Sequence, residues 1–108
     1  MDAPANLPPE LQEVEDELQA ALEKGGPEAC RMLVNGLAAE ATLGKTIADE
    51  AELVILETEE DAETFPEISE SSVAYIDKLD KTRLAGMLAT IRYSYAAMRI
   101  GEIERATR

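Results

Sequence analysis

Carboxylates are the side chains of this sequence best placed to bind a partner or an ion, and one dense group lies near residue 60. The group consists of Glu57, Glu59, Glu60, Asp61 and Glu63. If this segment is helical, the four acids from Glu59 to Glu63 fall within about 6 Å of helix axis. Duplex DNA carries one charge per about 1.7 Å of axis, so the two charge densities are comparable. We therefore expect a binding site for a basic protein surface. A solvated connector that keeps the chain soluble is the alternative.

A second acidic group lies near the N-terminus, where one lysine, Lys24, accompanies six acids. These are Glu10, Glu13, Glu15, Asp16, Glu17 and Glu23. Glu13 and Glu17 are one helical turn apart, and like charges at that spacing cost a few tenths of a kcal/mol. This pattern does not stabilise a helix, so we expect either salt or a basic partner to neutralise the repulsion between these acids. A generic exposed acidic face is the alternative.

The same carboxylates could bind a metal ion. All-helical phosphohydrolases of the MazG type use an EExxE pair and a downstream ExxD, and the most similar spacings here are Glu10, Glu13 and Asp16, or Glu57 and Glu60. Neither string is joined to an apolar pattern that would turn it inward, and few basic residues lie nearby to hold a substrate phosphate. A metal-dependent nucleotide phosphohydrolase therefore remains only an alternative. We predict no catalytic residue, no metal and no cofactor.

Two residue types limit the catalytic options further. The sequence has no His, which excludes a Ser–His–Asp triad and a His-containing metal site. Its single cysteine, Cys30, cannot form a disulfide within the chain. Cys30 follows Pro27 in the first turn of an expected helix, where a thiol pKa can fall. Packing is the more ordinary role for a lone small residue at such a position.

Arginine and tyrosine gather near the C-terminus, at Arg92, Tyr93 and Arg99. Both residue types anchor protein interfaces, and Arg92 and Arg99 are two helical turns apart. This face is therefore a candidate contact with a protein partner or with a second copy in a homodimer. Intramolecular pairing of the arginines with acids of the earlier helices is the alternative.

The composition predicts one helical domain over residues 1–108. Ala and Leu dominate the apolar residues, which favours helix over strand. The net charge is −13, with 18 acids and three bases in residues 1–67 and five acids and seven bases after them. This balance argues against binding nucleic acid or an anionic membrane. One cysteine and no export signal favour the cytoplasm. Adaptation to a high-salt environment is a competing explanation for the acidity.

Apolar periodicity and turn residues place the elements. The expected fold is an all-α antiparallel bundle of four to five helices with one acidic connector. A loose leader over 1–6 precedes helices over 8–24 and 27–43, and a third helix begins at Thr46. Residues 52–58 could instead be a strand, but no other segment offers a pairing partner. The connector covers 59–72 and is followed by a short helix over 73–79 and a long one over 81–105.

Two expectations concern packing. The main buried stripe of the last helix is expected to be Leu84, Met87, Leu88, Ile91, Tyr95 and Met98. Gly36 inside a helix is costly and suggests a close neighbouring backbone. Together these features favour a non-catalytic, acidic, helical protein–protein interaction module. A DNA-mimic inhibitor of a nucleic-acid-binding protein is an alternative, and it requires the carboxylates to line one continuous face.

Overall fold

Two long helices make up the fold. The computed structural model describes residues 6–107, so most of the leader expected at residues 1–6 lies outside the described residues. Helix α1 covers Pro9–Thr64, the 3-10 helix η1 covers Pro66–Ile68, and helix α2 covers Ser69–Ala106. No helix within residues 6–107 is both long enough and apolar enough to span a membrane.

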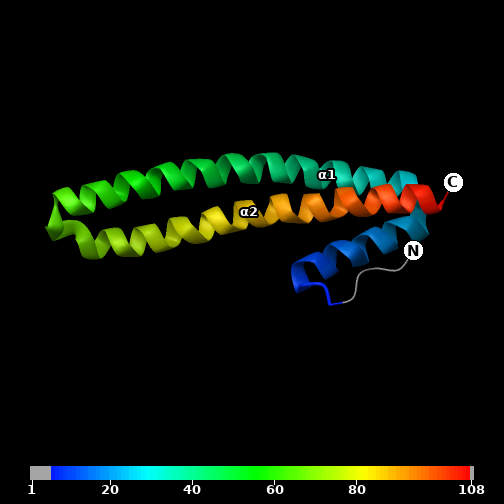
Figure 1. Ribbon diagram of the computed structural model, residues 1–108, viewed down its shortest axis with the longest axis horizontal. Helices are drawn as coiled ribbons and strands as arrows, with labels where there is room; N and C mark the ends of the chain where they lie inside the picture. Colours follow the sequence, from blue (N-terminus) through cyan, green and yellow to red (C-terminus); the bar gives the residue numbers. More distant parts are fainter. Residues whose placement is uncertain (1–5, 108) are drawn as a thin grey trace.

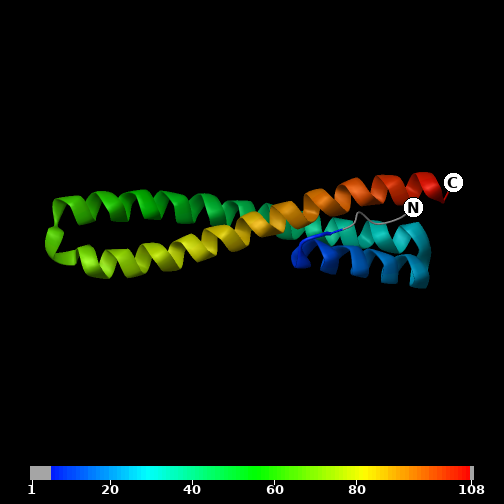
Figure 2. The ribbon, with the colours of Figure 1, turned by 60° about the horizontal axis from the view of Figure 1, so that its bottom comes forward.

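Helix α1 reverses direction at Gly26. This residue has φ 70° and ψ −164°, a backbone conformation that only glycine adopts readily. The reversal divides α1 into an N-terminal segment (residues 9–25) and a long segment (residues 27–64). Pro27 begins the long segment, at a position where a missing N–H costs nothing. The N-terminal segment therefore lies alongside the ends of the long segment and of α2 (Figures 1 and 2).

The long segment and α2 form an antiparallel hairpin that accounts for the shape of the molecule. The structure measures 63 × 25 × 18 Å. Three helical segments pack together in the half that contains the last turns of α2, and only the two arms of the hairpin continue to the turn at η1 (Figure 1). The main core lies in the three-segment half. Its buried residues are Val14, Leu18, Cys30, Val34, Leu37, Tyr95, Ala96, Ile100 and Ile103.

The two arms approach each other closely through small residues. Buried positions on α1 recur with the alternating spacing of four and three that is typical of helix pairs: Leu37, Ala41, Gly44, Ala48 and Ala51. At the tightest point Gly44 faces Gly86. A methyl group on Gly44 would lie 2.7 Å from the Gly86 carbonyl oxygen, so only glycine fits.

The expected bundle of four to five helices is wrong, because two expected breaks do not occur. The helix expected over 27–43 does not end there but continues through Gly44. The hydroxyl group of Thr46, the expected start of the third helix, donates instead to the Thr42 carbonyl oxygen at 3.2 Å. The hydroxyl group of Thr82, near the expected start of the helix over 81–105, likewise donates to the Lys78 carbonyl oxygen at 3.2 Å. Residues 52–58 are helical. The connector expected over 59–72 shrinks to residues 65–68, and α2 is one continuous helix.

Candidate functional site

The structure contains three features that could serve a function: a buried ionic cluster, an acidic tip and an exposed apolar stripe. The cluster lies inside the three-segment half. The acidic tip is the group Glu57, Glu59, Glu60, Asp61 and Glu63 at the turn end of α1. The apolar stripe runs along α2.

Glu15 and Arg99 form the centre of the buried ionic cluster. Arg99 donates from Nε to Glu15 Oε1 at 2.7 Å and from Nη2 to Glu15 Oε2 at 3.1 Å. Tyr95 Oη and Gln19 Nε2 each donate to the same carboxylate at 2.6 Å. Arg99 Nη1 donates to Glu102 at 2.7 Å. The Arg99 side chain is fully buried, so the cluster fastens the N-terminal segment to α2 from the inside.

The ionisation of the cluster follows from these contacts. Burial alone would raise the pKa of Glu15, but the hydrogen bonds from Arg99, Gln19 and Tyr95 outweigh burial and lower the pKa to about 2. Burial and the hydrogen bond to Glu15 raise the pKa of Tyr95 to about 12. The hydrogen bond to Glu15 also raises the pKa of Arg99. Each group is therefore held in its present protonation state across the neutral range.

Cys30 belongs to the same region and is fully buried. Its Sγ donates to the Leu18 carbonyl oxygen at 3.3 Å, across the interface with the N-terminal segment. Burial, and then the negative charge of Glu15, raise the pKa of the Cys30 thiol. A reactive thiol would need the opposite shift, so the geometry favours the packing role.

The Arg/Tyr face expected on the last helix does not form one exposed surface. Arg99 takes the intramolecular alternative and pairs with Glu15. Arg92 is largely covered, with Nη1 3.9 Å from Glu40. Tyr93 packs against the core. Of the residues expected to bind a partner, these three are mainly covered by the rest of the chain, whereas those of the acidic tip are exposed.

Glu15 was not singled out as a site residue, although a signal was present in the sequence. It stood among the acids of the expected exposed face. Positions 11, 15, 18 and 22 follow the spacing of a buried helical stripe, and Glu15 is the only charged residue on it. A charge at a stripe position predicts a buried partner of opposite sign. Arg99 supplies that partner, 84 residues later in the sequence.

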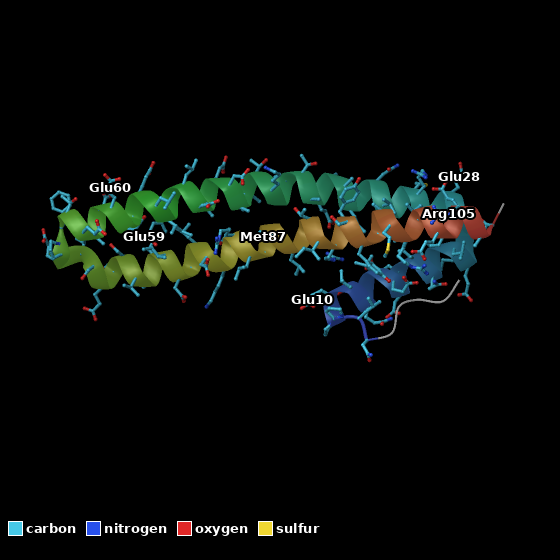
Figure 3. All side chains as sticks on the ribbon, viewed as in Figure 1. Glu10, Glu28, Glu59, Glu60, Met87 and Arg105 are labelled. Carbon is cyan, nitrogen blue, oxygen red and sulfur yellow. The ribbon has the colours of Figure 1, made fainter. Side chains whose placement is uncertain are left out.

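The acidic tip is exposed and unpaired. None of its five carboxylates makes a salt bridge within residues 6–107. Figure 3 shows Glu60 on the outer side of α1 and Glu59 on the side toward α2. Glu59 and Glu60 thus point to different sides of the helix, whereas a DNA mimic requires its carboxylates to line one continuous face.

The described residues contain no group of three or more Asp, Glu or Cys side chains arranged to hold a metal ion. Glu10, Glu13 and Asp16 are all exposed on the outer face of the N-terminal segment. They do not converge with a later carboxylate across a pocket, as the phosphohydrolase alternative requires.

The apolar stripe was expected to be core, but most of it lies at the surface. Leu84, Met87, Ile91 and Met98 are each between 47% and 53% exposed. Of the six expected core residues, only Tyr95 is fully covered, and Leu88 is half-buried. Small residues fill the seam between the arms, so these large side chains are left on the side of the hairpin.

Comparisons with protein-family models, with curated proteins and with solved structures return no match for this chain.

Proposed function

We propose that this chain is a non-catalytic interaction module that binds a basic protein surface with its acidic tip. One observation carries the proposal: five exposed carboxylates gather within two helical turns and have no cationic partner in the described chain. Their mutual repulsion is relieved when a partner supplies positive charge, which gives electrostatic steering and specificity.

The position of the tip supports this function. It lies at the turn of a long hairpin, far from the three-segment core (Figure 1). A partner can therefore reach it from several directions without disturbing the fold. The continuous helices on both sides of the turn hold the charges in place, which lowers the entropy cost of binding.

The test uses three purified baits for affinity capture. The tip variant carries Glu59→Gln, Glu60→Gln, Asp61→Asn and Glu63→Gln. The control carries Glu10→Gln, Glu13→Gln, Asp16→Asn and Glu17→Gln, so it loses the same charge from the N-terminal segment. We expect a protein that the wild type and the control retain and the tip variant loses.

That protein is then purified and titrated against all three forms. We expect its dissociation constant to rise at least tenfold for the tip variant and less than threefold for the control, with affinity falling as salt increases. If both variants lose the same proteins, or if none is lost selectively, the acidic tip is not a binding site. Thermal unfolding of each bait confirms that the fold is intact.

A further inference from the structure

We propose that two copies of this chain associate through the apolar stripe of α2, with the two α2 helices antiparallel. The stripe consists of Leu84, Met87, Ile91 and Met98, all about half exposed. The proposal concerns a surface separate from the acidic tip and does not depend on its function.

The spacing of the stripe identifies its occupant as a helix. Its members are separated by three, four and seven residues, the repeat that keeps one side of a helix against another helix. Large side chains at this spacing insert between those of a facing helix. The seam between α1 and α2 uses small residues, so the stripe is a second helix-packing surface that the hairpin itself does not use.

For a second copy, charge favours α2 over α1 as the facing helix. Helix α1 contains 16 acidic and three basic residues, whereas α2 contains five acidic and six basic residues. Two molecules that each carry a charge of −13 repel strongly if their α1 helices meet. Contact through α2 brings together the surfaces of lowest net charge.

The elongated chain exposes more surface than a compact monomer of its mass. The chain exposes 7207 Å², about 1,300 Å² more than the roughly 5,900 Å² expected for a compact monomer of its mass. A standard interface buries about 800 Å² on each partner. A dimer through one side of the hairpin therefore removes surface that the single chain has in excess.

The ends of the stripe determine the orientation. The same heptad positions continue to Asp77 and Asp80 before Leu84 and to Arg105 after Met98. Arg105 makes no salt bridge within residues 6–107. An antiparallel pair with its two-fold axis near Ile91 brings Asp77 of each copy close to Arg105 of the other. Asp77 and Asp80 also pair with Lys81 and Arg83 of their own helix, so Arg105 is the charge that gains a new partner. A parallel pair would bring like charges together.

The first test is sedimentation equilibrium of the purified chain in about 0.5 M salt, where repulsion is largely screened. We expect a dimer. The double substitution Leu84→Glu and Ile91→Glu should raise the dissociation constant of the dimer at least 100-fold. The control substitutions Leu43→Glu and Leu53→Glu add the same charge at exposed leucines of α1. They should change the dissociation constant of the dimer less than threefold. Circular dichroism of each variant confirms the helix content.

The second test fixes the orientation with a short bismaleimide crosslinker. Ile91→Cys lies near the two-fold axis, so it should crosslink two copies. Val73→Cys is also exposed but lies tens of ångströms from its counterpart in an antiparallel pair, so it should not crosslink. The natural Cys30 is buried, and the wild type measures its background reaction.

Four results would overturn the proposal. The first is a wild-type monomer at about 1 mM. The second is a dimer that survives the α2 substitutions but not the α1 substitutions. The third is efficient crosslinking at Val73→Cys, which would indicate a parallel pair. The fourth is the absence of crosslinking at Ile91→Cys. Because no other protein takes part, none of these results bears on the acidic tip.

Discussion

At the residue scale, the ion pair between Glu15 and Arg99 controls how the N-terminal segment is held. Removing two charges from water is costly, and here the cost is offset by bidentate geometry and by hydrogen bonds to the remaining lone pairs. The pair therefore contributes less net stability than its short distances suggest. Its loss is nevertheless severe, because one charge would remain buried with its main partner missing.

Glu15→Gln should accordingly lower the free energy of unfolding by about 3 kcal/mol, since breaking one side of a buried pair typically costs 3 to 5 kcal/mol. Urea denaturation followed by circular dichroism measures the loss. Glu13→Gln is the matched control, because it removes the same charge at an exposed position two residues away. If the two variants lower the free energy of unfolding equally, the buried pair contributes no more to stability than an exposed charge.

The same pair gives the stability a defined pH dependence. The Glu15 pKa falls from an ordinary 4.5 to about 2 in the fold, so its contribution is fully present above pH 4.5. It is lost as the pH falls from 4.5 toward 2, because the unfolded chain then binds a proton that the folded chain does not. We expect the stability difference between wild type and Glu15→Gln to shrink across this window. A difference that stays constant from pH 5 to pH 2 would contradict the assignment.

The sequence predicted the surface acids better than the buried one. The acids of the tip are exposed, as acids in a polar segment usually are. Glu15 lies on an apolar stripe with Leu11 and Leu18, but no local pattern names Arg99 as its partner. That pairing depends on the reversal at Gly26, which brings the N-terminal segment against α2.

At the element scale, Cys30 reports whether the N-terminal segment is docked. Its thiol lies beneath Leu18, so a disulfide reagent can reach it only after the segment has moved away. We expect slow reaction in the wild type and reaction roughly 100-fold faster in Glu15→Gln, as about 3 kcal/mol of lost docking energy implies. Quenched aliquots analysed by mass spectrometry measure the rate. Wild-type reaction as fast as in urea would show that the segment does not cover the thiol.

Two glycines of the long segment should respond in opposite ways to alanine. Gly36 has no atom within 4 Å of an added methyl group, so Gly36→Ala should stabilise the helix by about 0.5 to 1 kcal/mol. The close neighbouring backbone expected at Gly36 is instead found at Gly44. Gly44→Ala should destabilise the fold by about 1 to 3 kcal/mol through overpacking. Denaturation midpoints compare the two variants, and a shift of the same sign would contradict the close approach of the arms.

The first helix and the all-helical class were predictable from apolar periodicity and composition, but helix also covers 59–64 and 69–72, where a connector was expected. The continuity of the long helices was not. Gly44, Thr46 and Thr82 are common at helix ends, but here one is required by close packing and the others bond back along the helix. Local preference is weak enough for packing between the arms to override it.

At the scale of the whole molecule, the acidity should make stability depend on salt. Repulsion within a chain of charge −13 is largely screened by about 1 M salt, where the Debye length is about 3 Å. We expect the midpoint of thermal unfolding to rise with KCl and to level off below about 1 M. Dimerisation should strengthen over the same range. A midpoint that still rises steeply at 3 M would instead favour adaptation to high salt. The proposal that the acidic tip binds a partner would then lose its main support.

The stripe on α2 shows why the whole-molecule arrangement could not be predicted. Periodicity correctly groups Leu84, Met87, Ile91 and Met98 on one side of a helix. It does not say whether that side meets another part of the same chain or another molecule. The small residues opposite Gly86 determine which side of α2 packs against α1, because they allow the closest approach of the two arms.

The reversal at Gly26 also governs whether the chain shares a segment with a neighbour. Residues 9–25 and 27–64 are both helical, and a single residue with a non-helical backbone separates them. If that residue became helical, the N-terminal segment would project as a straight extension of α1. It would then reach the equivalent core of another molecule, as in domain swapping.

Pro27 opposes this exchange. In a continuous helix it would leave one carbonyl without a donor and would clash with the preceding turn, at a cost of about 3 kcal/mol. It also disfavours the helical conformation at Gly26, the residue before it. The Gly26–Pro27 pair therefore keeps the N-terminal segment folded onto its own chain, so that copies of the protein can meet without exchanging parts.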